Sequence, residues 1–154
     1  MYTSVTIILA QSLLALAAVV NIPESTNILS KRTVTDCLGN RNGAIVPNDL
    51  SDILTQISGV SGGVIHFKPN DTPRVFRSGD CVAGVVSASP ETGGSVSAGK
   101  VTSAGLEILL QCADAHLDPN TGRGWSGVTR NIPATVDGQW YTLNVYRDIA
   151  TDTA

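Results

Sequence analysis

The stretch PNDLSDILTQISGVSGGVIHFK, residues 47–68, determines the fold more than any other part of the chain. Its first half places four apolar residues at positions i, i+3, i+4 and i+7, which form one face of an α-helix. These residues are Leu50, Ile53, Leu54 and Ile57. Asn48 or Asp49 is predicted to cap the start of this helix, and Gly59 is predicted to end it.

Strand patterns follow this helix. Residues 64–68 alternate apolar and polar side chains, which is the pattern of a half-buried β-strand. Further strands are expected over residues 75–77, 81–88, 128–132 and 139–147. Residues 89–99 are rich in Gly, Ser and Pro and are expected to form a loop.

A second helix is expected over residues 100–115, with its apolar face turned to the sheet. The last strand divides into two faces, because successive side chains point to opposite sides. One face carries Trp140, Thr142, Asn144 and Tyr146, and the other carries Tyr141, Leu143 and Val145. The order of elements predicts an α+β fold, with two helices packed on one face of a mostly antiparallel sheet. A ferredoxin-like α/β sandwich is the nearest common architecture.

The N-terminal residues have the pattern of a secretory signal peptide. Residues 6–20 are apolar apart from Thr6, Gln11 and Ser12, and this run is too short for a membrane span. A small-x-small pattern predicts cleavage after Ala17 or Ala18, so residues 1–17 are assigned to the signal peptide. The mature form is therefore expected to be extracellular and not membrane-spanning.

Lys31-Arg32 is a dibasic pair in a polar segment downstream of this leader. Such a pair is the preferred cut site of Kex2-type processing proteases in a eukaryotic, fungal secretory pathway. Residues 18–32 are then a pro-segment, and residues 33–154 form a single globular domain. Removing the leader and pro-segment leaves 8 basic and 12 acidic residues, because Glu24, Lys31 and Arg32 are lost. The resulting charge of −4 argues against a nucleic-acid partner held by bulk electrostatics.

All three cysteines, Cys37, Cys81 and Cys112, lie downstream of the dibasic pair. Secretion favours disulfides, and an odd count leaves one thiol over. We predict a Cys81–Cys112 disulfide, because each residue lies inside a well-patterned element. A bond from Cys37 to Cys81 or Cys112 is the rival pairing. In the predicted arrangement Cys37 is free, capped or linked to a second chain in a dimer.

Several short segments share one pattern with a known group of proteins. These are Asp36-Cys37, the strand segment GDCVAGV (79–85), the helix segment LLQC (109–112) and a Gly/Trp turn before the last strand. The chain resembles small secreted fungal proteins of the killer-toxin-like and Ecp2-like (necrosis-inducing factor) type over most of residues 33–147. The resemblance implies an α/β sandwich held by disulfides and a role as a toxin or infection effector. It supplies no catalytic residue, and this chain has fewer cysteines than most members.

No residue pattern predicts a catalytic, cofactor or metal site. His116 follows Asp114 by two residues, but a histidine at a helix end is more often placed there by the helix dipole. Cys112, four residues before His116, is expected to be a disulfide partner rather than a nucleophile. The two histidines and three cysteines also lack the spacing of metal ligands. Asn70 opens an Asn-x-Thr sequon in a turn and is the candidate glycosylation site.

Trp125 lies in a glycine-rich segment, flanked in sequence by Arg123 and Arg130. The tryptophan is either an exposed anchor for a partner or a ring folded over the sheet edge. The leading hypothesis is a non-enzymatic secreted protein that binds a host or competitor target, either a protein or a glycan. A small secreted hydrolase of the nuclease kind and a cell-wall-associated structural protein are the two alternatives.

Overall fold

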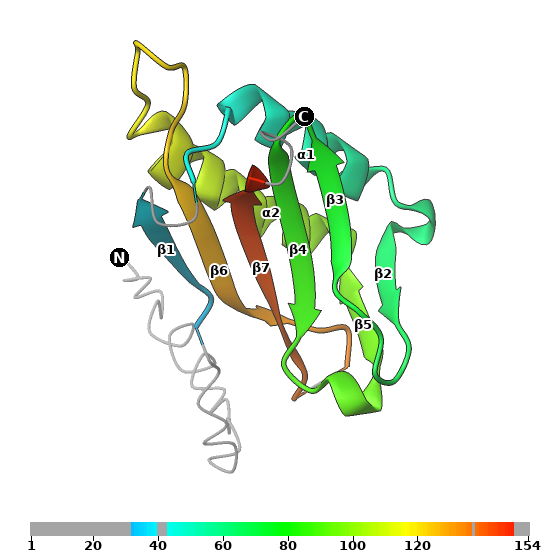
Figure 1. Cartoon of the computed structure of the whole chain (residues 1–154). Helices are drawn as coiled ribbons and strands as arrows, with labels where there is room; N and C mark the ends of the chain where they lie inside the picture. Colours follow the sequence, from blue (N-terminus) through cyan, green and yellow to red (C-terminus); the bar gives the residue numbers. More distant parts are fainter. Residues whose placement is uncertain (1–31, 40–42, 137, 150–154) are drawn as a thin grey trace, which may run out of the picture. The chain divides into compact units, whose positions relative to one another are not determined.

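The structure is a computed structural model that describes residues 32–39, 43–136 and 138–149. In this part of the chain both helices lie on one side of a five-stranded sheet, which gives two layers (Figure 1). The predicted α+β class is confirmed. The expected signal peptide and the expected pro-segment as far as Lys31 lie outside the described residues.

All neighbouring strands of the larger sheet are antiparallel, in the order β1-β6-β7-β4-β3. These strands are β1 (Val34–Gly39), β3 (Arg74–Ser78), β4 (Cys81–Ser87), β6 (Ser126–Pro133) and β7 (Trp140–Arg147). β2 (Val64–Phe67) and β5 (Gly94–Ser97) pair with each other in a separate two-stranded sheet. Short 3-10 turns occur at Ser61–Gly63 and Pro90–Thr92.

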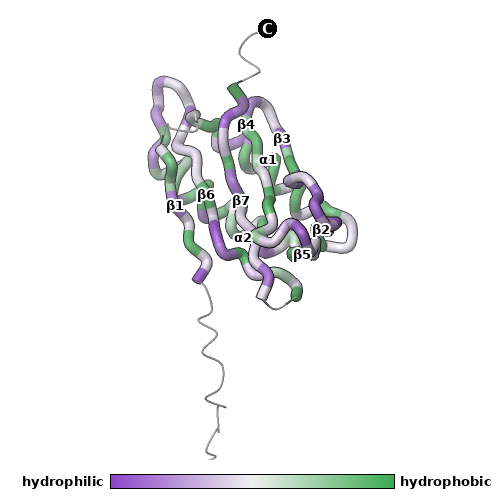
Figure 2. The backbone as a smooth tube through the Cα atoms, turned by 60° about the horizontal axis from the view of Figure 1, so that its bottom comes forward, coloured by the Kyte–Doolittle hydropathy of each residue, from purple (hydrophilic) through white to green (hydrophobic). Residues whose placement is uncertain are grey.

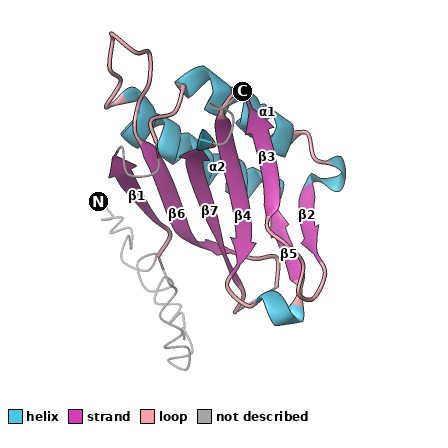
Figure 3. Cartoon of the chain, viewed as in Figure 1, coloured by secondary structure: helices cyan, strands magenta, loops and turns pink. Residues whose placement is uncertain are grey.

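The two helices are α1 (Pro47–Ser58) and α2 (Ala98–Ile108), and α2 continues into a π-helical turn, Leu109–Asp114 (Figure 3). The predicted cap of α1 is wrong, because Asn48 and Asp49 lie inside the first turn and Val46 is the N-cap. Pro47 explains the earlier start, since its fixed φ suits the first helical position, where the missing N–H is not needed. Gly59 follows the helix as predicted.

The core lies between the helices and the sheet. The four apolar residues predicted for α1 are all buried there. The sheet contributes Ala83 and Val85 from β4 and alternate residues of β7, which are Tyr141, Leu143 and Val145. α1 and α2 pack closely, because a Cβ added at Gly105 would lie 2.2 Å from Cδ2 of Leu54. Close packing of the two helices therefore requires glycine at position 105, despite its low helix propensity.

Two strands were not predicted. β1 lies in a segment for which no strand was expected, and β5 lies inside the expected loop 89–99. β1 is an edge strand with only partly buried or exposed residues, so it carries little hydrophobic alternation. β5 reads GSVS and buries only Val96, which leaves no periodic signal to detect.

The predicted Cys81–Cys112 disulfide is wrong: Cys37 bonds to Cys112, and Cys81 is a buried free thiol. Cys37 pairs with Gly127 in the β1–β6 ladder, and a Cβ at Gly127 would lie 3.2 Å from Sγ of Cys112. The end of α2 therefore lies over β6, whereas Cys81 belongs to β4, beyond β7. Two strand spacings separate β4 from β6, about 10 Å, which exceeds the reach of a disulfide. The thiol needed for the expected Cys37-linked dimer is consequently used within the chain.

Candidate binding surface

The sheet has a second face that no helix of the described residues covers. In Figure 1 the strands lie in front of α1 and α2, so this face is turned toward the viewer. On β7 the buried residues alternate with half-buried ones, and the half-buried set points away from the helices. We call this surface the open face and define it by the four residues Trp140, Thr142, Asn144 and Tyr146 of β7 with their neighbours in the sheet register.

Strand register arranges the open face in rows. The central row crosses all five strands and contains Asp36, Val128, Asn144, Gly84 and Val75. Figure 2 shows both hydrophilic and hydrophobic segments along β6 and β7. The row therefore places the amide of Asn144 between Val128 on one side and Gly84 on the other.

Asn144 is the distinctive residue of this row. Its Oδ1 atom is enclosed and has no hydrogen-bond partner among the described residues. Its neighbour Gly84 has little exposed surface, yet a Cβ built there would meet no other atom within 4 Å. A shift of the Asn144 side chain toward the space beside Gly84 would let this oxygen accept a hydrogen bond from the hydroxyl or N–H group of a ligand.

Aromatic side chains lie at both ends of β7 on the open face. Trp140 and Tyr146 are six residues apart on β7, which corresponds to about 20 Å along an antiparallel strand. Both side chains are half-buried, so each presents part of its ring to solvent. Such residues combine an apolar ring face with a polar tip, which suits ligands that have both apolar and hydroxyl surfaces.

Charged residues on the open face are paired with one another. Arg130 forms an ion pair with Asp36 across β6 and β1, and Arg77 forms one with Asp148 at the opposite side of the sheet. Each pair joins one positive and one negative group, so neither end of the face carries a strong net charge. Electrostatics therefore favours a neutral ligand here.

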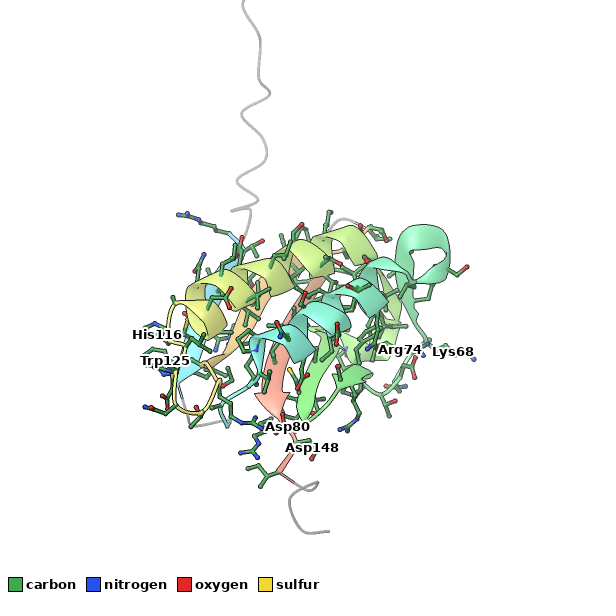
Figure 4. The ribbon with its side chains drawn as sticks, turned by 90° about the horizontal axis from the view of Figure 1, so that it is seen from above. Lys68, Arg74, Asp80, His116, Trp125 and Asp148 are labelled. Carbon is green, nitrogen blue, oxygen red and sulfur yellow. A yellow bond between two sulfur atoms is a disulfide. The ribbon has the colours of Figure 1, made fainter. Side chains whose placement is uncertain are left out.

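The three residues predicted to contact a partner do not form one patch. Trp125 stacks on His116, with ring centroids 3.5 Å apart and planes 8° from parallel, and it packs partly on the core (Figure 4). Arg123 donates to Asp80 and to the carbonyl of Ala44. The ring of Trp125 is therefore held against His116 and the core.

Arg130, the third of these residues, lies apart on the open face. It was predicted to contact a partner because it lies near Trp125 in the sequence. It belongs to the surface on which Trp140 and Asn144 lie, and neither of these was a predicted site residue. The alternation in residues 139–147 was the available signal, but only the placement of both helices on one side identifies the uncovered face.

Asp80 holds together the end of the sheet at which β4 begins (Figure 4). Arg123 approaches its carboxylate with two nitrogens, at 3.1 and 2.7 Å, and Nε of Arg147 donates to it at 2.8 Å. The hydrogen bond from Arg123, followed by that from Arg147, holds the pKa of Asp80 below its ordinary value against the opposing effect of burial. Burial and the nearby charges of Asp80 and Asp52 raise the pKa of Asp49. The cluster is internally neutralised and acts as a structural clamp.

The residues with catalytic potential are dispersed over the described part of the chain. His66 lies exposed on β2, and His116 is occupied by Trp125. Burial, followed by the charges of Asp49 and Asp80, raises the pKa of Cys81 to about 12, so its thiol is not activated. In the same residues, no cluster of three or more His, Cys, Asp or Glu has the arrangement of a metal site. Asn70 is exposed in a turn, where its glycosylation remains a prediction.

Comparisons with known proteins do not assign the chain to a group. No family model matches it, and no curated protein or solved structure does so either. Among the helices that the structure describes, none combines the length and the apolar character needed to cross a bilayer.

Proposed function

We propose that this chain is a secreted recognition protein of the killer-toxin-like or effector kind, which acts without catalysis by binding a glycan of a host or competitor. The observation that carries the proposal is the line of Trp140, Thr142, Asn144 and Tyr146 on a sheet face left uncovered by the described helices. Further observations support a glycan as the ligand and secretion as the route by which the protein reaches it.

The chemistry of the open face favours a neutral, hydroxyl-rich ligand. Sugar rings have apolar C–H faces that stack on aromatic rings, and hydroxyl groups that donate to an amide oxygen. Trp140 and Tyr146 supply the rings, and Oδ1 of Asn144 supplies an acceptor to which no described residue donates. An oligosaccharide of several units has the length to reach from one ring to the other.

Secretion is supported by the leader pattern, by Lys31-Arg32 and by the chemistry of the cysteines. The Cys37–Cys112 bond closes a loop with a sequence separation of 75 residues. Disulfides that act structurally in this way form and persist in oxidising compartments. A protein that leaves the cell meets the polysaccharides of its own and of other cell surfaces, which is where a glycan-binding face is useful.

Tryptophan fluorescence tests the proposal directly, because the chain has only two tryptophans. In a Trp125→Phe variant, Trp140 is the only reporter, and it lies on the open face. We expect titration with chito-, gluco- or manno-oligosaccharides to shift its emission in a saturable way for one of these classes. A general decrease without saturation, or no change at millimolar sugar, overturns the proposal.

A matched variant separates the open face from the helical side. Leu110→Ala removes an exposed side chain on the π-helical turn, on the helical side of the sheet, and we expect it to leave the titration unchanged. The sugar should also be recovered intact after incubation. Release of new reducing ends contradicts a non-catalytic role and favours the hydrolase alternative.

A further inference from the structure

The bond between Arg32 and Thr33 is held against the domain by one residue, Asn131. Nδ2 of Asn131 donates to the carbonyl oxygen of Arg32 at 3.2 Å, and Oγ1 of Thr33 donates to the carbonyl oxygen of Asn131 at 3.2 Å. These two hydrogen bonds clasp the residues on either side of the Arg32–Thr33 bond. That bond is the one a protease specific for Lys31-Arg32 would cut.

The backbone of β6 is shaped to make this clasp. Asn131 has φ 59, a left-handed conformation that Asn tolerates better than most residues. It lies where the register between β6 and β7 shifts, between Thr129 and Ile132. The bulge therefore interrupts regular pairing next to the first residues of the described domain, where the carbonyl of Asn131 accepts from Thr33 and its side-chain amide donates to Arg32.

Downstream residues hold the segment as well. Val34 and Thr35 pair with Arg130 and Thr129 in the β1–β6 ladder. Oγ1 of Thr35 donates to Oε2 of Glu107 at 2.7 Å, which ties β1 to α2. The disulfide at Cys37 then fixes the strand four residues beyond Thr33. Only a short segment of chain is free to detach while the disulfide is closed.

A serine endoprotease needs this same segment in another arrangement. It binds its substrate as an extended chain and places the carbonyl oxygen of the cut bond in its oxyanion hole. Hydrolysis adds one water across the bond, which leaves a carboxylate on Arg32 and an ammonium group on Thr33. The carbonyl oxygen of Arg32 must leave Asn131 before it can enter that site.

We propose that Asn131 is a latch that holds the Arg32–Thr33 bond against the folded domain and thereby slows its cleavage by a dibasic-specific protease. This inference rests on the proposed secretory route, since it requires a dibasic-specific serine protease. The latch makes the rate of processing depend on how readily the first residues of β1 detach from β6.

The test compares cleavage of the oxidised, folded full chain with cleavage of a synthetic peptide of residues 25–40, by a Kex2-type protease and intact mass. We expect the folded chain to be cut at least about 100-fold more slowly than the peptide, because the start of β1 must first detach. Asn131→Gly keeps the left-handed backbone but removes the amide, and should speed cleavage of the folded chain about 5- to 10-fold, as loss of one net hydrogen bond predicts.

Gln56→Ala is the matched control. It removes a side-chain amide that donates to the carbonyl of Arg77 at 2.9 Å, on the opposite edge of the sheet. We expect it to leave the cleavage rate unchanged. The double variant Cys37→Ser, Cys112→Ser should speed cleavage more than Asn131→Gly, because a longer part of β1 can then detach.

The outcomes separate the two proposals. A peptide that resists the protease refutes the processing site itself, and the latch with it. A peptide that is cut as fast as the folded chain refutes the latch and leaves the processing site intact. Equal rates for Asn131→Gly and the unchanged folded chain show that β1 alone protects the bond, which also overturns the role of Asn131.

Discussion

Replacing Asn144 with leucine should stabilise the fold and weaken binding at the same time. An enclosed polar atom without a partner costs about 1–3 kcal/mol, and an apolar side chain of similar size removes this penalty. Oδ1 of Asn144 is such an atom. We expect Asn144→Leu to raise the free energy of unfolding by about 1–2 kcal/mol, which raises Tm by about 3–8 °C in a domain of this size.

The assay measures stability and affinity on the same variants. Urea unfolding followed by circular dichroism gives the free energy of unfolding, and Trp140 emission in the Trp125→Phe background gives the affinity for the responsive sugar. We expect Asn144→Leu to weaken binding at least about 10-fold, since a buried hydrogen bond to the ligand is lost.

Gln139→Met is the matched control, because Oε1 of Gln139 is also enclosed without a partner. Gln139 precedes β7, outside the four residues that define the open face. We expect this variant to leave the affinity unchanged, while its stability stays the same or rises. A gain in stability for Asn144→Leu with undiminished affinity would refute the assignment of the open face. A loss of more than about 1 kcal/mol would show that the amide has a structural partner.

Four further outcomes follow from the fold. The double variant Cys37→Ser, Cys112→Ser should lose about 4 kcal/mol in urea unfolding, because the bond closes a loop with a separation of 75 residues; a loss below 1 kcal/mol would contradict that bond. Asp80→Asn should lose about 2–3 kcal/mol at pH 7. The lowered pKa of Asp80 means that its contribution is complete above about pH 4 and disappears as pH falls through the folded-state pKa, so a destabilisation by Asp80→Asn that does not shrink as pH falls below about 4 would refute the clamp. Cys81 should resist thiol reagents at pH 8 until the protein unfolds, and rapid labelling of the folded protein would contradict its burial. Gly124→Ala should lower Tm by several degrees, because the added Cβ would lie 1.9 Å from the carbonyl oxygen of Ala113; an unchanged Tm would show that the loop has room to move.

Local pattern predicted the elements that bury a periodic apolar face. α1 and β7 are examples, because Leu50 and Ile57 on the helix and Leu143 on the strand recur with the period of their element. β1 and β5 are held by pairing with distant strands and bury few side chains, so their residues carry no such period. Edge pairing is a tertiary property, which a single sequence does not display.

The predicted Cys81–Cys112 disulfide was wrong for a related reason. Sequence pattern identified elements that contain Cys81 and Cys112 but gave no order of strands in the sheet. The observed order places β7 between β4 and β6, and it brings the end of α2 over β6 and β1 instead. Whether two cysteines can form a bond depends on that strand order, because a disulfide tolerates only about 4.4–6.8 Å between Cα atoms.

Only part of the candidate site could be predicted from the sequence. The alternation that places Trp140 and Asn144 on one side of β7 is visible in the sequence, whereas the side that the helices cover is not. Trp125 attracted attention because glycines surround it, but the nearby end of α2 supplies His116 as a stacking partner. The glycines around Trp125 therefore did not indicate that its ring is exposed.

The most direct test of the account is an amide and side-chain NMR map of the protein during titration with the responsive oligosaccharide. The account predicts shifts concentrated on β7 and its neighbours β4 and β6, with the side-chain amide of Asn144 and the indole of Trp140 among the largest. Shifts confined to α1, α2 or the segment from His116 to Trp125, or no shifts with any sugar class, would contradict binding at the open face.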